Sequence, residues 1–394
     1  MSFMASSFLS NIIFISMDCS KGCERDMEQI YCAALTSLLN YDAPLWVPRF
    51  REIFGSCRAA WEAGRKDLAG AGLLSRELSQ VWDSARKEAL PERIYDYCQK
   101  HQVRLLGRWS PGYPPLLAQL SAPPPVLYCK GELPEEESAL AIVGSRKATD
   151  YGLGAAGKFA RAAAAEGVPV ISGGAYGIDA AAHRAALDAG GKTVAVLGGG
   201  LEELYPRRHL RLFDRICQEG ALVTEYDPWT PPLPQNFPLR NRIIVGLSKA
   251  VLVVEAAIRS GAMSTAHAAV DENRELFAVP GPISSETSQG THRLLKQGAR
   301  LADDPEEILE FLLGPRAERI PPQAAETDLF RDLSPSEQKK ARALCAWLQK
   351  HQGRSLEEIA DHFPWPLPVL STLLLELELM GRVQRNSRNR YNAV

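Results

Sequence analysis

The chain has 394 residues, a formal net charge of −2 and 45% hydrophobic residues. This length and composition predict a protein of two or three folded domains and exclude fibrous, fully disordered and strongly basic classes. No run of about 18 apolar residues is present, so no membrane-spanning helix is expected. Eight cysteines without a C-x-x-C pair indicate reduced thiols in a cytoplasmic protein. Residues 1–26 are expected to form a disordered extension.

Residues 27–101 predict a helical N-terminal domain of the SAM or helix-hairpin-helix type. The candidate helices cover residues 28–39, 45–54, 56–63, 75–89 and 91–101. Gly70 and Gly72 lie between two of these helices, as in small modules that approach a DNA backbone. A bundle used for packing or protein contacts is the favoured interpretation of this region, and DNA binding is the alternative.

Residues 102–313 predict a Rossmann-like α/β core with a mostly parallel sheet. The candidate strands are 126–130, 140–143, 168–172, 193–197, 221–225, 250–255 and 276–279, and the candidate helices are 151–166, 179–189, 208–218 and 264–272. Strands and helices that alternate at this spacing form a parallel sheet covered on both faces. Open α/β folds bind ligands at the carboxyl edge of such a sheet.

The turn after the strand at 140–143 carries an anion-binding pattern. Gly144 lets a backbone approach closely, Ser145 adds a hydroxyl, and Arg146 adds a planar set of donors. A helix that starts at Thr149 or Asp150 is expected to point its free N–H groups into the same crevice. The turn by itself fits a phosphate site and a tight structural turn equally well. Neither the dinucleotide G-x-G-x-x-G nor the P-loop fingerprint is met.

Further glycine turns follow other strands at the same edge. They lie at 172–179, 198–200, 260–265 and 280–282. Their convergence predicts a long crevice whose floor consists of backbone N–H groups, suited to a polyanion. The alternative is that these glycines only form short loops.

The segment 236–248 combines basic and aromatic side chains, with Phe237 ahead of Arg240, Asn241 and Arg242. Charge beside an aromatic ring is typical of a groove for single-stranded nucleic acid. The structural alternative is that one of these arginines pairs with Glu225 or Glu255 at a strand end.

Candidate catalytic groups are few. Asp179 and His183 are spaced i, i+4 and are the only acid–base pair that the pattern suggests. An Asp at a helix start is more often a cap or dipole partner. No nucleophile stands in a local signature and no histidine cluster has metal spacing. No catalytic site, cofactor or metal is predicted.

Residues 314–330 predict a polar linker, and residues 331–394 predict a winged-helix-like domain with helices at 335–351, 355–362 and 369–380. The expected recognition helix holds no Arg or Lys between Val369 and Gly381. This composition favours a protein contact over reading of the DNA major groove.

The motifs in their order resemble those of the bacterial DNA-processing family DprA, also called Smf. The resemblance covers residues 105–312. It rests on six sequence motifs that occur in the family's order: 143–146, 172–179 with His183, 198–200 with 205–206, 237–244, Glu255 with 260–265, and 278–281. It implies a Rossmann-like core that binds single-stranded DNA, forms a homodimer and helps load RecA during natural transformation, without being an enzyme.

Carried onto this chain, the resemblance implies a set of nucleic-acid contacts: Gly144, Ser145, Arg146, Arg207, Phe237, Arg240, Asn241, Arg242, Ser260 and Gly261. The loop 229–235 is proline-rich and has no lysine where the family pattern leads one to expect a basic residue. Affinity is therefore expected to depend more on Arg207, Arg208 and Arg240.

Two other classes remain open. Related Rossmann-like proteins bind or hydrolyse nucleotides, but they typically carry P-G-G-x-G-T where this chain has Val279-Pro-Gly-Pro-Ile. The third hypothesis is an interaction scaffold whose end domains recruit partners.

Overall fold

The computed structural model describes residues 21–73, 82–86, 88, 90–136, 138–315, 335–379, 383–386 and 390–393. The chain divides into two compact units, residues 1–320 and 321–394. Most of the expected extension 1–26, most of the candidate helix 75–89 and nearly all of the expected linker 314–330 lie outside the described residues. The division into a helical domain ending at 101 and a core beginning at 102 stays a prediction.

A mostly parallel sheet organises the first unit, as the sequence predicts. Within the described residues it has nine strands in the order β1-β2-β6-β5-β4-β3-β7-β8-β9. The strands from β6 to β9 in this order are parallel, whereas β2 is antiparallel to β6 and β1 is antiparallel to β2. Their bounds are β1 Val103–Gly107, β2 Val126–Gly131, β3 Leu140–Val143, β4 Val170–Ser172, β5 Thr193–Val196, β6 Ala221–Thr224, β7 Ala250–Val253, β8 Glu275–Ala278 and β9 Arg300–Leu301. The sequence did not predict β1 and β9.

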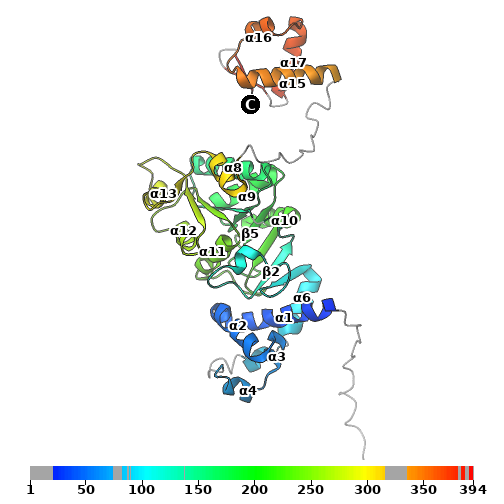
Figure 1. The fold of residues 1–394 in the computed structure, drawn as a ribbon, viewed down its shortest axis with the longest axis vertical. Helices are drawn as coiled ribbons and strands as arrows, with labels where there is room; N and C mark the ends of the chain where they lie inside the picture. The colour runs from blue at the N-terminus through cyan, green and yellow to red at the C-terminus, as the bar shows by residue number, and fades with distance from the viewer. Residues whose placement is uncertain are drawn as a thin grey trace, which may run out of the picture. The chain divides into compact units, whose positions relative to one another are not determined.

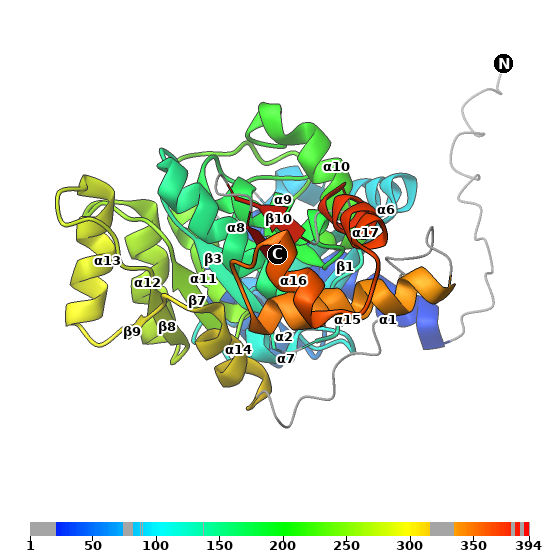
Figure 2. The same ribbon diagram turned by 90° about the horizontal axis from the view of Figure 1, so that it is seen from above.

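Helices cover both faces of this sheet (Figure 1, Figure 2). One face carries α8 Asp150–Ala165, α9 Ile178–Asp188, α10 Leu210–Glu219 and α14 Pro305–Leu313. The other carries α7 Pro115–Ala118, α11 Asn236–Gly246, α12 Gly261–Asp271 and α13 Glu286–Lys296. Because both faces are covered, the central strands are short, fully buried apolar runs. No helix among the residues described is long and apolar enough to cross a membrane.

The N-terminal helices share a core with the sheet. They are α1 Lys21–Leu39, η1 Asn40–Asp42, α2 Ala43–Phe54, α3 Cys57–Glu62, α4 Arg65–Gly70 and α6 Leu90–His101. Leu35 of α1 and Phe50 of α2 belong to the same buried cluster as Tyr128 of β2 and Phe213 of α10. The helical region is therefore packed against the α/β core as part of one compact unit.

The second unit is a winged helix domain. Helices α15 Pro335–Lys350, α16 Leu356–His362 and α17 Leu367–Leu379 are followed by the two-stranded sheet of β10 Val383–Arg385 and β11 Tyr391–Ala393. Ser355 and Glu358 form a capping box at the start of α16. A small core that includes Leu344, Leu370 and Val383 joins the helices to the wing.

The N-terminus of α8 is closed by the protein's own carboxylate. The Thr149 hydroxyl accepts a hydrogen bond from the Gly152 amide at 3.2 Å. Buried Glu255, just after β7, accepts hydrogen bonds from the amide and the hydroxyl of Thr149 at 2.9 and 2.6 Å. A carboxylate is stabilised at this end of a helix by the helix dipole. The Glu255 carboxylate therefore binds the N-cap residue of the helix end that was expected to point free N–H groups into the crevice.

Gly152 makes this closure possible, which gives a stability prediction. A Cβ at position 152 would lie 2.4 Å from the Glu255 carboxyl group, whereas a Cβ at Gly154 on the same helix would meet nothing within 4 Å. We expect Gly152→Ala to destabilise the protein by about 1–3 kcal/mol, because the crowded carboxylate must shift. Gly154→Ala should stabilise it by about 0.5–1 kcal/mol through helix propensity. Urea denaturation measures both, and equal stabilities would contradict the crowding.

Candidate nucleic-acid groove

A groove of about 880 Å³ lies at the carboxyl edge of the sheet. The turns after β3 and β7 and the first turns of α11 supply most of its wall. Eight of the ten predicted site residues line it: Gly144, Ser145, Arg146, Phe237, Arg240, Asn241, Ser260 and Gly261. The fold thus brings together side chains that are more than a hundred residues apart in sequence.

The Phe237 ring is the aromatic centre of the groove. It is half-buried, and two guanidinium groups lie over it, with the Cζ atom of Arg146 at 5.2 Å and that of Arg240 at 5.8 Å from the ring centroid. The exposed Tyr205 ring meets it edge-on at 6.0 Å between centroids. Guanidinium groups at these distances are attracted to the face of the ring. The groove therefore combines an aromatic surface with positive charge.

Arg240 is an internal anchor. Only 3% of it is exposed, and its Nη1 donates to the carbonyl oxygen of Gly173 at 2.9 Å and to that of Val196. Burial lowers the pKa of Arg240 to about 10, and neighbouring Asp179 opposes this shift. The side chain thus ties α11 to the ends of β4 and β5. Backbone carbonyls therefore engage the Arg240 guanidinium, and the expected dependence of affinity on Arg240 stays a prediction.

The turn after β4 is likewise occupied from inside. The Asp179 Oδ2 atom accepts hydrogen bonds from the amides of Gly173 at 3.1 Å and Ala175 at 3.3 Å. Burial raises the pKa of Asp179, and the Arg240 charge counteracts this. A Cβ on Gly173 would lie 2.7 Å from that oxygen. These two amides therefore bind the protein's own carboxylate. They are not among the backbone N–H groups that were expected to line the crevice for a polyanion.

The two predicted site residues outside the groove wall are Arg242 and Arg207. Arg242 forms an ion pair with Glu225, in which the two side chains are 19% and 10% exposed. This confirms the structural alternative for one of the two arginines. Arg207 is exposed in η2 Arg207–His209, directly after Tyr205-Pro206.

The structure adds groove residues that the sequence prediction omitted. Lys147 and Tyr205 line the groove and are exposed, and Glu286 and Thr287 from the start of α13 complete its rim. Lys147 directly follows the Gly-Ser-Arg turn, so the sequence could have predicted it as a groove residue. Glu286 and Thr287 could not be predicted, because helix α13 itself was not predicted.

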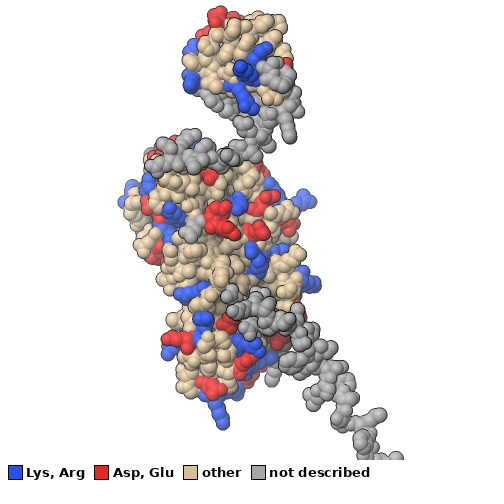
Figure 3. All heavy atoms as spheres, turned by 45° about the vertical axis from the view of Figure 1, so that its right-hand side comes forward, with Lys and Arg blue, Asp and Glu red and all other residues tan. Residues whose placement is uncertain are grey.

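Figure 3 shows that basic and acidic side chains alternate over the face of the first unit that it draws, without an extended basic field. The positive charge that the groove offers to solvent is local. It comes from the exposed side chains Arg146 and Lys147 at the rim.

Asp179 and His183 do not act on each other as an acid–base pair. The His183 Nδ1 atom lies 2.7 Å from the Thr193 hydroxyl oxygen, and that hydroxyl donates to the Val170 carbonyl at 2.6 Å. His183 Nδ1 therefore carries the proton, and its buried Nε2 has no hydrogen-bond partner among the described residues. Burial lowers the pKa of His183 to about 3. No cluster of three potential metal ligands occurs in the described part of the chain.

The buried neutral His183 predicts acid sensitivity. An unfolded histidine titrates near pH 6.5, so below this pH the unfolded chain binds a proton that the folded chain rejects. Stability should fall by about 1.4 kcal/mol per pH unit, or about 2 kcal/mol by pH 5. Urea denaturation at pH 7 and pH 5 measures this loss. The His183→Gln variant should lose less stability between pH 7 and pH 5 than wild type. The control His267→Gln, at an exposed histidine, should lose as much as wild type. An unchanged loss in His183→Gln would contradict the assignment.

Arg240 and Arg146 should differ in their effect on folding. Arg240→Ala leaves Asp179 buried without its opposite charge, which should lower the free energy of unfolding by about 3–5 kcal/mol. Arg146→Ala removes an exposed side chain and should change that free energy by less than about 0.5 kcal/mol. Urea denaturation of the two variants checks the difference. Similar losses would show that Arg240 is not an anchor.

Comparison with known proteins identifies the family. The family described as "DNA recombination-mediator protein A" matches residues 104–313, and the family "DprA winged helix domain" matches residues 321–387. "Protein Smf" of Escherichia coli is 41% identical over 318 residues, covering 80% of this chain and 83% of that protein. The "DNA processing protein DprA" of Streptococcus pneumoniae is 41% identical over 198 residues, covering 50% of this chain and 70% of that protein.

A solved structure supports the same assignment. The X-ray structure of DNA processing protein A from Streptococcus pneumoniae aligns with a TM-score of 0.56 at 29% identity, covering 75% of this chain and 99% of that chain. The family match spans more than half of the present chain, and the Escherichia coli relative is similar over most of its length. The chain belongs to the DprA/Smf family of DNA recombination-mediator proteins.

Proposed function

We propose that the groove binds single-stranded DNA and that the protein helps load RecA recombinase onto the bound strand during DNA uptake and transformation. The observation that carries this proposal is the half-buried Phe237 ring in the groove wall, with the guanidinium group of the exposed Arg146 over it. An aromatic ring engages a base while neighbouring cations neutralise phosphates. Membership in a family of recombination mediators supports the same function.

The N-terminus of α12 is the second phosphate-binding element of the proposal. Ser260 and Gly261 line the groove at this helix end, and Ser260 makes no side-chain capping bond. The buried Ser260 hydroxyl has no partner among the described residues. Uncapped N–H groups at a helix start favour an anion. Together with Arg146 and Lys147 this end provides the proposed phosphate contacts in the groove that Phe237 lines.

Binding is proposed to be passive, and the nucleotide-enzyme alternative is less well supported. At the turn after β4, one place where a mononucleotide phosphate would be held, the Asp179 carboxylate accepts the hydrogen bonds of the Gly173 and Ala175 amides. A phosphate there would meet like charge. RecA loading and a homodimer are parts of the proposal that family membership supports, and a cytoplasmic location is supported by the eight cysteines without a C-x-x-C pair.

The DNA-binding proposal is tested with labelled oligo-dT across a salt series. If about four phosphates are neutralised, the log–log salt slope should be roughly −3. Arg146→Ala should weaken binding and reduce that slope by about 0.7, because one phosphate contact is lost. Phe237→Ala should cost about 1–3 kcal/mol without changing the slope, because it removes stacking only.

A matched control is Arg215→Ala, which removes an exposed arginine of α10 that pairs with Asp188 outside the groove wall. Its affinity should equal that of wild type. A salt slope near zero, or equal affinity for a duplex of the same length, would contradict the proposal.

A further inference from the structure

We propose that Tyr41 of the N-terminal helical region is a positioning residue for the groove. Its hydroxyl holds the start of α11 and thereby places the Phe237 ring opposite Arg146. The inference rests on the proposed single-strand binding. It gives the helical region a role in that binding without a DNA contact of its own.

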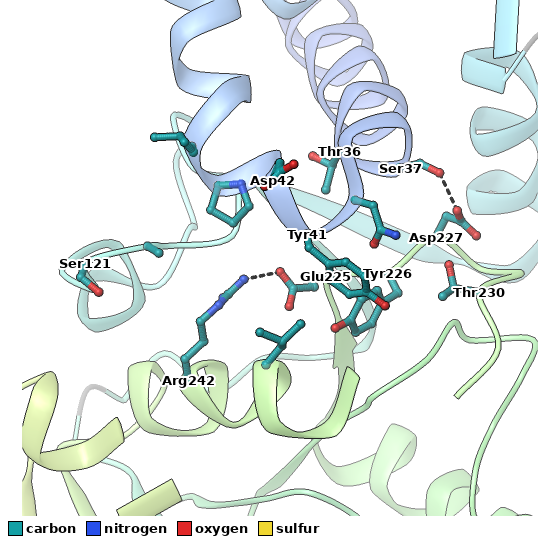
Figure 4. A pocket seen from close by; sticks show the side chains of 15 residues that line it. Thr36, Ser37, Tyr41, Asp42, Ser121, Glu225, Tyr226, Asp227, Thr230 and Arg242 are labelled. Atoms are coloured by element: carbon teal, nitrogen blue, oxygen red, sulfur yellow. Dashed lines mark hydrogen bonds and ion pairs between the residues drawn. The ribbon is translucent and has the colours of Figure 1, made fainter. Parts of the chain in front are cut away.

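Tyr41 reaches the core from the tight turn between α1 and α2. Asn40 has a φ of +51°, a left-handed conformation that asparagine tolerates better than most residues. The next residue, Tyr41, directs its hydroxyl to the Asn236 side chain, where Oη donates to Oδ1 at 2.7 Å. Figure 4 shows the Tyr41 ring beside Tyr226, at the junction between the N-terminal helices and the core.

Asn236 is the first residue of α11 and is fully buried. Its Nδ2 donates to the Pro231 carbonyl at 3.3 Å, and its own carbonyl accepts from the Tyr226 hydroxyl at 3.4 Å. The preceding N-cap residue, Gln235, makes no side-chain capping bond. The start of α11 is therefore fixed through Asn236, and Tyr41 supplies the donor for its amide oxygen. Without that donor a buried acceptor would be unsatisfied.

A displacement of Asn236 would move the groove residues Phe237 and Arg240, because all three belong to the first turns of α11. Phe237 is the next residue, and Arg240 lies one turn further along, on the same side of the helix as Asn236. Arg240 is anchored at its guanidinium by the carbonyl groups of Gly173 and Val196. The Tyr41 contact fixes the other end of this helical turn. The Phe237 ring is held between the two attachments.

The hydrogen bond, more than packing, holds Tyr41 in place. A cavity of about 510 Å³ lies beside it, lined also by Asp42, Ser121 and Arg242 (Figure 4), and 44% of Tyr41 is exposed. A second contact supports the same junction, because the Ser37 hydroxyl donates to Asp227 at 2.5 Å. The loop from Asp227 to Asn236 is thus joined to the helical region at both ends.

The test is a double-mutant cycle in the full-length protein with labelled oligo-dT. Tyr41→Phe removes only the hydroxyl and should weaken binding by about three- to tenfold. The salt slope should stay at the wild-type value, because no phosphate contact is lost. In a Phe237→Ala background the same substitution should have no effect, because no ring remains to be positioned. Tyr95→Phe, at an exposed tyrosine of α6, is the matched control and should bind as wild type.

Unchanged binding in Tyr41→Phe would overturn the inference, as would an equal loss in both backgrounds, which indicates a general structural effect. Amide hydrogen exchange provides a test that needs no DNA. Tyr41→Phe should speed exchange of the amides at the start of α11, and Tyr95→Phe should not. If Phe237→Ala binds as tightly as wild type, the proposed stacking of a base on the Phe237 ring is wrong. The exchange result then still decides whether Tyr41 positions α11, and unchanged exchange there would overturn the inference.

Discussion

The buried guanidinium of Arg240 holds together the edge of the sheet at which the groove lies. It reaches from α11 to carbonyl groups at the ends of β4 and β5 and lies beside the buried Asp179 carboxylate. A buried charge is tolerated only when it is hydrogen-bonded and compensated, and this site provides both. Because Asp179 in turn accepts hydrogen bonds from the amides of the turn after β4, one charged network sets the relative positions of α11 and the ends of β4 and β5.

Buried and exposed charges in the groove have separate roles. Arg240 and Asp179 are buried and define the shape of the wall, whereas Arg146 and Lys147 are exposed at its rim. One arginine of each kind lies over the Phe237 ring. The N-terminal helices extend the rigid part, since Tyr41 and Ser37 bind the loop that leads into α11.

Much of the fold and of the groove could be predicted from sequence, for identifiable reasons. The central strands are short buried apolar runs, and the glycine turns that follow them converge because parallel strands end at one edge. The strand β9 has two exposed residues and gave no such signal. The helix α11 was not recognised, because buried polar residues on its inner side hide the apolar period. Without that helix, the opposite orientations of Arg240 and Arg242, two positions apart, could not be deduced. The bond from Thr149 to Glu255 spans 106 residues and leaves no local pattern.

The glycines of the carboxyl edge have a consequence for how the sequence evolves. A side chain at Gly152 would collide with Glu255, and one at Gly173 would collide with Asp179 and Arg240. In both cases the atoms that fill the space belong to the protein itself. Selection for folding alone is sufficient to keep glycine at these positions, whatever the groove binds. Evolutionary constraint on ligand binding should instead be sought at the exposed rim, where Arg146 and Lys147 could change without disturbing the core.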